Sequence, residues 1–558
     1  MINYKKHSVN ILVLLLVTLM LLTSCRNEKK PVKSNTSGKN SSQMDGNTSS
    51  NNEQDTESSD DVHTQSNNMT GYSLNGDYSV KISLSRPADD ANEYRVSGNC
   101  AVLNTNYAGY ADAQAEALRK EILNTKNTTD IYKIKGQCYY ISPNGDNNND
   151  GKTPKTALRT TDGIDGVDLE RGDAILFERN SIFRITRAIS PQEGITYGSY
   201  GKGDKPKIYA CAENYANRNL WQPSNKKNVW KTEFSYGEVG DIVFNHGEMI
   251  GYWKRNGIDQ LEKNTQYYHN KVDGITYLYC DKGNPGDVYK DIEICPDYNI
   301  FDIPKFVDNV TIDNLCLKYS SHGAVSGAYK NKNIVITNCE IGYIGGYAGA
   351  SGGVRQGNAV QIWASTENMI ADHNWIYQTF DTAISPQGGG DGAVYTNISF
   401  CNNLLEYNSV DFEWFDRAGT LFDGIKCDGN IMRFTSLGWG NRVDDAGVRG
   451  IEGCIRANTC EQTFKNFSFK NNIIDCPGRQ IINWTLDIPQ LDEINAGYNK
   501  VFINATYRKI FSSNPAILRG LHETGTSNAE INATNQSELE TIWKYFDKSS
   551  SSAVKWYD

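Results

Sequence analysis

The sequence predicts an all-β protein: a right-handed parallel β-helix with a small inserted β domain and helical end caps. Two observations predict this fold. Short segments of alternating apolar and polar residues repeat between residues 309 and 499, and an asparagine ends most of them. In addition, the spacing between the repeats varies, as expected for coils joined by loops of different length.

Each repeat unit reads asparagine, apolar, any residue, apolar, any residue, polar, and then asparagine or cysteine. The alternation with a period of two predicts a strand with one buried face. The units begin at Asn309, Asn333, Asn368, Asn397, Gly424, Asn466 and Glu493. A leucine-rich solenoid is the competing repeat fold, but leucines at its fixed spacing of about 20–29 residues are absent from the sequence.

The final position of the unit predicts a ladder of asparagines. In a parallel stack of coils, equivalent residues lie about 4.8 Å apart. Asparagine amides at that spacing can hydrogen-bond to one another and to the turn backbone, so we expect most of them to be structural. The position is occupied by Cys339, Asn374, Asn403, Asn430, Asn472 and Asn499, with gaps of 35, 29, 27, 42 and 27 residues.

The N-terminus predicts export and a lipid anchor. Two lysines precede an apolar run over residues 11–22, which is too short to span a bilayer about 30 Å thick. Small residues then lead into Cys25, the pattern of a bacterial lipoprotein signal in which that cysteine carries the lipid. We expect an extracytoplasmic protein held to the membrane or cell surface by this anchor alone. An ordinary signal peptide with an incidental cysteine is the alternative.

The predicted domains are a signal peptide over 1–25, a disordered Asn/Ser-rich tether over 26–70, an N-terminal segment over 71–138, a β-helix over 139–545 and an inserted β domain over 212–297. Residues 112–124 have Ala115, Leu118 and Ile122 on one side of a helix, which we expect to cap the first coil. Residues 537–540 form a capping box that opens a helix at the other end.

Composition excludes some classes of function. The net charge is −10, the isoelectric point is about 5.4 and the sequence has no basic patch, so nucleic-acid binding is not expected. None of the cysteines after Cys25 forms a CxxC pair, which argues against a zinc site. We expect buried, mostly free thiols, no metal or other cofactor, and a monomer.

Several motifs resemble secreted right-handed parallel β-helix proteins. The segments at 139–146, 151–154 and 170–178 are similar to their entry coils, and 198–206 is similar to the turn that follows. The later segments 357–361, 380–387, 411–414 and 438–444 also match, and the resemblance covers about 400 residues. With the inserted β domain, the chain looks most like the β-helix glycoside hydrolases of the α-L-fucosidase or xylanase type. The resemblance implies a carbohydrate-active enzyme, although hydrolases, lyases, epimerases and adhesins share this scaffold.

Alignment of the coils on the asparagine ladder indicates a candidate active site. It places Gln361, Ser385 and Glu413 in one outward row, and Ala359, Ala383 and Asp411 in another outward row. Val360, Ile384 and Phe412 then point into the core. Asp381 begins the strand of the preceding coil. Carboxylates about 5–10 Å apart suit glycoside cleavage, so Asp381, Asp411 and Glu413 are the candidate acid and base or nucleophile.

Aromatic and polar side chains around these carboxylates are candidates for substrate binding. Tryptophans offer stacking faces for sugar rings, and arginines can hold hydroxyl groups or a carboxylate. Glu406, which precedes a turn tyrosine, is expected at the surface. The candidates are Arg355, Gln361, Trp363, Gln387, Trp414, Trp439, Arg442 and Asp444.

Three functions stay open from the sequence. The first is a glycoside hydrolase acting on a polysaccharide or oligosaccharide with paired carboxylates. The second is a polysaccharide lyase on uronate-containing glycan, for which a basic residue and often Ca²⁺ would be needed. The third is a non-catalytic glycan-binding surface protein. The sequence offers arginines near the site but no clear lysine base and no compact acidic calcium cluster.

Overall fold

The chain divides into two units, residues 1–68 and 69–558, and all described residues belong to the second. The computed structural model describes residues 84–85, 95–96, 108–327, 329–346, 356–387, 392–415, 419–441, 453–458, 463–475, 477, 480–484, 493–504 and 535–557. The predicted signal peptide with Cys25, and the predicted tether, lie outside these ranges.

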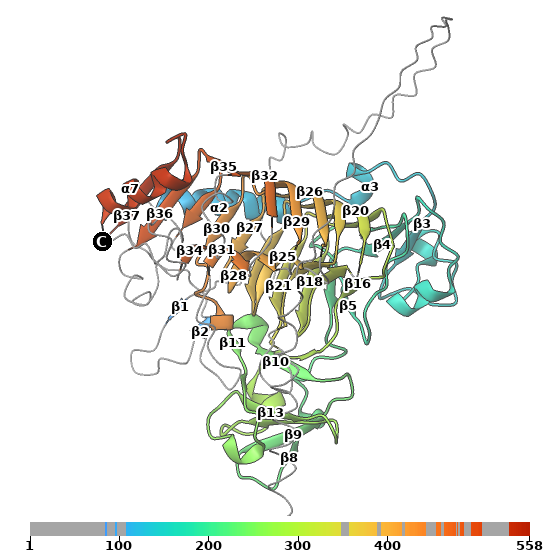
Figure 1. The fold of residues 1–558 in the computed structure, drawn as a ribbon. Coiled ribbons are helices and arrows are strands. Elements are labelled where there is room, and N and C mark those ends of the chain that lie inside the picture. The colour runs from blue at the N-terminus through green and yellow to red at the C-terminus, as the bar shows by residue number, and fades with distance from the viewer. Residues whose placement is uncertain are drawn as a thin grey trace, which may run out of the picture. The chain divides into compact units, whose positions relative to one another are not determined.

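Three long parallel sheets form the body of this unit (Figure 1). The chain visits them in turn, from β22 to β23 to β24 and back to β25, so each circuit is one coil. The fold is a right-handed parallel β-helix, as predicted. The seven-stranded sheet consists of β16 (Phe301–Ile303), β19 (Val325–Gly327), β22 (Val360–Trp363), β25 (Thr382–Gln387), β28 (Val410–Phe415), β31 (Gly453–Asn458) and β34 (Gln480–Trp484).

The other two sheets have ten strands each. The β3–β35 sheet consists of β3 (Cys138–Ile141), β4 (Ala174–Glu178), β6 (Thr196–Tyr200), β17 (Val310–Asp313), β20 (Asn331–Thr337), β23 (Thr366–Asp372), β26 (Val394–Cys401), β29 (Leu421–Lys426), β32 (Thr463–Lys470) and β35 (Ile494–Gly497). The β5–β37 sheet consists of β5 (Ile182–Arg184), β7 (Lys207–Tyr209), β18 (Cys316–Ser320), β21 (Glu340–Ile344), β24 (Trp375–Thr379), β27 (Leu404–Glu406), β30 (Ile431–Arg433), β33 (Ile473–Asp475), β36 (Lys500–Asn504) and β37 (Ala553–Tyr557).

The described elements outside the three parallel sheets and the strands between β7 and β16 are short apart from two helices. They are α2 (Ala108–Leu123), α3 (Thr128–Ile131), α4 (Pro285–Val288), α7 (Gln536–Phe546), the hairpin of β1 (Leu84–Ser85) and β2 (Arg95–Val96), and the 3₁₀ turns η1 (Pro154–Thr156), η2 (Thr161–Gly166), η3 (Arg218–Leu220), η4 (Asn245–Gly247), η5 (Ile258–Gln260) and η6 (Trp439–Asn441).

The predicted asparagine ladder is confirmed at the turn between the β3–β35 and β5–β37 sheets. Asn403 is fully buried, and its Oδ1 accepts hydrogen bonds from the backbone and the side-chain amide of Asn374 at 3.0 and 3.1 Å. Its own amide donates to Ala371 O at 2.8 Å and to Asn430 Oδ1 at 3.1 Å. The same pattern links the later rungs, so each turn is held by the coil beside it.

A second asparagine ladder, at the start of the repeat unit, lies on the surface. Asn333, Asn368 and Asn397 each donate a side-chain hydrogen bond to the previous coil, at 2.9 to 3.1 Å. All three adopt a positive φ, which asparagine tolerates better than most residues. Gly424 takes the next rung with φ +73°, and a Cβ there would approach Asn397 Oδ1 to 3.2 Å. Gly424 therefore keeps the backbone conformation of the asparagines, although the sequence pattern changes at this position.

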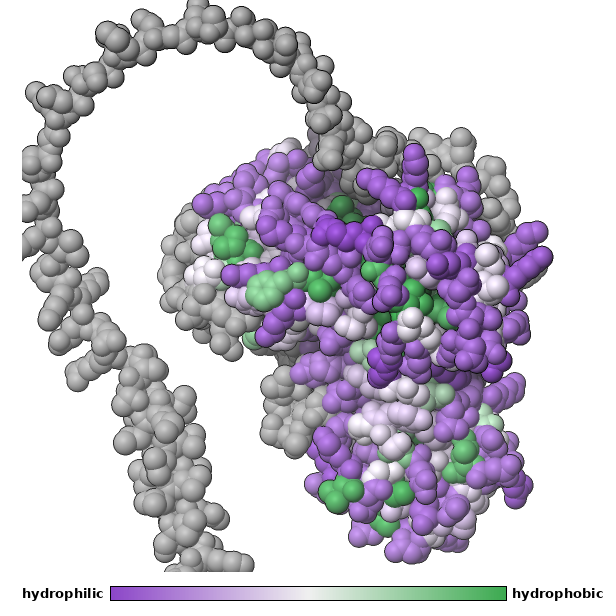
Figure 2. All heavy atoms as spheres, turned by 90° about the vertical axis from the view of Figure 1, so that its right-hand side faces the viewer, coloured by the Kyte–Doolittle hydropathy of each residue, from purple (hydrophilic) through white to green (hydrophobic). Residues whose placement is uncertain are grey.

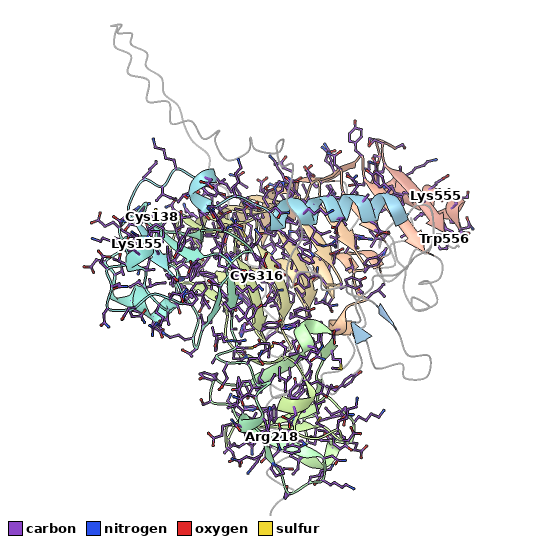
Figure 3. The ribbon with its side chains drawn as sticks, turned by 180° about the vertical axis from the view of Figure 1, so that it is seen from behind. Cys138, Lys155, Arg218, Cys316, Lys555 and Trp556 are labelled. Atoms are coloured by element: carbon purple, nitrogen blue, oxygen red, sulfur yellow. The ribbon has the colours of Figure 1, made fainter. Side chains whose placement is uncertain are left out.

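The predicted N-terminal helix is present as α2, but its predicted place over the first coil is wrong. It lies along the outer face of the β5–β37 sheet (Figure 3). Ala115 and Ile122 are fully buried there, in a cluster with Trp375 and Phe434. Packing on this aromatic face buries the apolar side of α2.

Charged groups also hold α2 to this sheet, and they correct the expectation that Glu406 is a surface residue. Glu406 is 3% exposed, and both of its oxygens accept hydrogen bonds from Arg119 on α2, at 2.9 and 2.7 Å. Arg433 lies on its other side, 3.3 Å away. Burial raises the pKa of Glu406, but the charges of Arg119 and Arg433 outweigh burial and hold that pKa below its usual range.

The predicted C-terminal helix is confirmed as α7. Leu539, Trp543 and Phe546 on α7 join the main core cluster inside the β-helix, so α7 closes this end. The helix begins slightly earlier than predicted, because Asn535 is the N-cap and accepts a hydrogen bond from the backbone of Glu538 at 3.1 Å.

Between β7 and β16 the chain leaves the three parallel sheets, in the region where we expected an inserted domain. We call residues 211–296 the inserted segment. It has its own buried cluster, which includes Trp221, Tyr267 and Leu278. Its strands are β8 (Gln222–Pro223), β9 (Val229–Glu233), β10 (Val239–Phe244), β11 (Met249–Ile250), β12 (Tyr252–Trp253), β13 (Gln266–Asn270), β14 (Ile275–Tyr279) and β15 (Ile292–Pro296), which form a three-stranded and a five-stranded sheet (Figure 1).

The nine cysteines in the described part of the chain are free thiols, as expected, and seven of them are buried. Figure 3 labels Cys316 among the parallel strands and Arg218 in the inserted segment. No helix among the described residues is long and apolar enough to cross a membrane.

Candidate active site

The outward face of the seven-stranded sheet carries a row of polar side chains. Register pairs Asp302 with Ser326, Ser326 with Gln361, and Gln361 with Ser385. The pairing of Ile384 with Phe412 then brings Ser385 beside Glu413, and Glu413 pairs with Arg456. We call these six residues the polar row. The alignment of Gln361, Ser385 and Glu413 predicted from the sequence is confirmed.

Glu413 is the most connected member of the polar row. Its Oε2 accepts a hydrogen bond from Thr382 Oγ1 at 3.1 Å and lies 3.5 Å from Gln387 Nε2. Its Oε1 forms an ion pair with Arg456 Nη1 at 3.0 Å. Glu413 is only 2% exposed. The carboxylate therefore has partners on both neighbouring strands, β25 and β31, in surroundings where charge interactions are stronger than in water.

Asp381 lies one residue before Thr382, the residue that donates to Glu413. It is 3% exposed, and its backbone joins the coils on either side, with its N–H on Gly357 O at 3.4 Å and its carbonyl accepting from Val410 N at 3.1 Å. The structure thus brings Asp381 and Glu413 to neighbouring coils of one sheet.

The predicted outward orientation of Asp411 is wrong. Asp411 is fully buried, and its row continues through Ala359, Ala383 and Cys454, which all belong to the main core cluster. Its partners are Asn408 Nδ2 at 3.2 Å and Thr435 Oγ1. Two consecutive residues of each strand face inward at this corner, so the strict alternation assumed from the sequence fails there.

The burial of Asp411 changes its chemistry. Burial raises the pKa of its carboxyl to about 8, although hydrogen bonds from Thr435 and Asn408 act in the opposite direction. A carboxyl with this pKa is largely protonated at neutral pH. It satisfies polar groups of the corner and is not placed to meet a substrate on the outward face.

Two of the three predicted stacking tryptophans are packing residues. Trp414 is fully buried between Phe412 and Phe467, with ring centroids 6.0 and 5.1 Å away. Trp439 is 1% exposed, lies 4.8 Å from the Phe380 ring, and donates from Nε1 to a backbone carbonyl at 2.9 Å. Trp414 follows Phe412 by two residues, so alternation from the inward Phe412 already places it inside.

The other predicted binding residues divide into those near Glu413 and those outside the described ranges. Trp363 is half-buried at the end of β22 and pairs with Gln387, which reaches Glu413. Gln361 accepts a hydrogen bond from Asn358 Nδ2 at 2.8 Å and is 5% exposed. The predicted residues Arg355, Arg442 and Asp444 lie outside the described residues.

The sequence reasoning missed Arg456. It lies one coil beyond Glu413 in the polar row and is 12% exposed at its side chain. Extending the same register by one more coil, through Cys454 and Ile455, would have found it. In the part of the chain that the structure describes, no group of three His, Cys, Asp or Glu side chains could hold a metal ion.

Comparisons with known proteins give structural likenesses at low identity. No family model matches the chain, and no curated protein matches it. XylC in complex with xylose is similar at 13% identity, over 75% of this chain and 83% of that one, with a TM-score of 0.37. A GH136 lacto-N-biosidase from Eubacterium ramulus is similar at 14% identity, over 67% and 65%, with a TM-score of 0.31. A rhamnogalacturonan lyase is similar at 10% identity, over 75% and 87%, with a TM-score of 0.32.

Proposed function

We propose that the protein is a carbohydrate-active enzyme, and more specifically a glycoside hydrolase whose active site surrounds Glu413 and Asp381. The observation that carries the proposal is the setting of Glu413. A nearly buried carboxylate on the outward face of the sheet is held by Thr382, Gln387 and Arg456, a setting that supports a functional role.

The proposed chemistry uses the two carboxyl groups as a pair. One protonates the oxygen that leaves, and the other activates water or attacks the sugar directly. Asp411 is not part of this pair, because its carboxyl lies in the core. Cys25 would hold the enzyme outside the cytoplasm through its lipid, as the sequence predicts, and we propose a polysaccharide or oligosaccharide as its substrate.

The test compares two neighbouring carboxyls of β28. Glu413→Gln should lower kcat by about 10²–10⁴-fold, the usual contribution of a general acid or base, whereas Asp411→Asn should keep most of the activity. The measurement is the release of reducing ends from a panel of polysaccharides. Equal activity of Glu413→Gln and the wild type would place the site elsewhere.

A polysaccharide lyase is the second candidate, and Arg456 is the observation that favours it. An arginine beside the site can serve as the base that removes the C5 proton of a uronate. Reducing ends with absorbance from an unsaturated uronate would identify a lyase, and reducing ends without it a hydrolase. Glycan binding with neither signal, unchanged in Glu413→Gln, would leave a non-catalytic binding protein.

A further inference from the structure

A line of aromatic side chains follows the edge of the seven-stranded sheet where its strands end. Phe306 follows β16, Tyr329 follows β19, Trp363 ends β22 and Phe415 ends β28. Phe306 is 62% exposed, and the other three are half-buried. We call these four residues the aromatic edge.

Backbone hydrogen bonds connect the aromatic edge from coil to coil. Phe306 N–H donates to Tyr329 O at 3.0 Å, and Lys330 N–H, one residue on, donates to Ala364 O at 3.2 Å, directly after Trp363. Ala364 N–H then donates to Gln387 O at 2.9 Å. Gln387 pairs with Phe415 and approaches Glu413, so the edge leads into the candidate active site.

Phe306 combines a positive φ with an exposed ring. Its φ is +61°, a region that bulky residues rarely occupy and that costs about 1–2 kcal/mol. Its ring nevertheless stays exposed and meets Tyr329 edge-on, with centroids 5.5 Å apart. Lys330 Nζ lies 5.2 Å from the centroid of the Tyr329 ring. The exposed Phe306 ring, the neighbouring Tyr329 ring and the cation of Lys330 together offer a surface for a ligand.

The shape of the aromatic edge selects the kind of ligand. It is one ring wide, with at most one aromatic per coil, and polar residues of the polar row lie beside it. Exposed apolar patches larger than a few hundred Å² are the usual mark of protein or membrane partners. The face in Figure 2, on the side where β3 and β4 lie in Figure 1, is mostly hydrophilic, with hydrophobic residues in small separate patches. A narrow run of rings next to hydrogen-bonding groups suits sugar rings, which have apolar faces and polar rims.

We propose that the aromatic edge binds consecutive sugar rings of a glycan chain that extends from Glu413 toward the first coils. β16 and β28 are four strands apart in the sheet, which at about 4.8 Å per strand spans about 19 Å. The substrate is then a chain of several sugars and not a mono- or disaccharide alone. The inference rests on the proposed function for the place where the chain is cleaved, but binding to the edge does not require cleavage.

The test uses Phe306→Ala combined with Tyr329→Ala. Its matched control is Tyr498→Ala, since Tyr498 is also an aromatic with positive φ (+55°) and is 64% exposed, but follows β35 in another sheet. Affinity electrophoresis first identifies a polysaccharide that retards the protein in the gel. Oligosaccharides of increasing length are then cut from this polysaccharide. Calorimetry measures their binding to the protein in the Glu413→Gln background. We expect the double variant to bind long chains about 10-fold more weakly and the shortest chains as before, with no change for Tyr498→Ala.

The outcomes separate this inference from the proposed function. If the double variant loses affinity for short and long chains by the same factor, or binds both as well as before, the aromatic edge is not a binding site. Cleavage by the wild type would then still support the hydrolase. A length-dependent loss without any cleavage by the wild type would support the edge and overturn the hydrolase. If no polysaccharide of the panel retards the protein, both the aromatic-edge proposal and the proposed function fail. Thermal unfolding of the double variant and of Tyr498→Ala checks that both are folded.

Discussion

The seven-stranded sheet carries a buried carboxyl on its inward side, Asp411, and another on its outward side, Glu413. On β28, Asp411 and Glu413 are two positions apart, and both are buried carboxyls. Asp411 has only hydroxyl and amide partners, inside the β-helix, whereas Glu413 has an arginine as well as a hydroxyl and an amide, and lies in the polar row outside. The difference teaches that burial alone does not distinguish these two carboxyls. They differ in the side of the sheet on which they lie and in the charge of their partners.

The largest expected effect contrasts two tryptophans on the two sides of this sheet. Trp414→Ala should destabilise the protein by about 3–5 kcal/mol, because it empties a core site among phenylalanines. Trp363→Ala should cost far less stability, since the side chain is half-buried, but should weaken glycan binding. Urea unfolding and affinity electrophoresis measure the two effects. A stable Trp414→Ala variant with weakened glycan binding would reverse the assignment.

A smaller effect is expected from the two asparagine ladders, which offer an isosteric comparison. Asn403→Asp should cost about 3 kcal/mol at neutral pH, because it removes two buried donors and brings a carboxyl against the carbonyl of Ala371. Asn368→Asp, on the exposed ladder, should change stability by less than about 0.5 kcal/mol. Denaturant midpoints at pH 7 decide between them. Equal costs would mean that both ladders matter alike for the fold.

The smallest effect at acidic pH is expected from Asp411→Asn, below about 1 kcal/mol at pH 4, because an amide resembles the protonated carboxyl. The pKa of Asp411 is raised to about 8 in the folded state, while an unfolded aspartate has a pKa near 3.9. Its contribution to stability is therefore complete below about pH 4 and is lost as the pH rises toward 8. Wild-type stability should fall over this range more steeply than that of the variant. Parallel pH profiles from thermal unfolding would show that Asp411 is charged in the fold.

Much of the scaffold could be predicted from the sequence because the repeated asparagines show how the coils align. The asparagines at 374, 403 and 430 mark one corner of each coil, and counting from that corner places Gln361, Ser385 and Glu413 correctly. The count fails for Asp411 because the backbone turns inward for two consecutive residues, which alternation cannot reveal. Glu406 was placed at the surface because its partners, Arg119 and Arg433, are far away in the chain or on another coil.

The turn that carries the buried asparagine ladder also affects which parts of such a protein can vary in evolution. Successive rungs of the buried ladder are separated by 35, 29, 27, 42 and 27 residues, yet each rung meets the next in the same way. The link between the β3–β35 and β5–β37 sheets stays short, as between β23 and β24 or β32 and β33, so most of the variation in length falls in connections around the seven-stranded sheet. Insertions and deletions there leave the register untouched. The loops around the candidate site can thus change in length and sequence, one coil at a time, while the register of the coils stays the same.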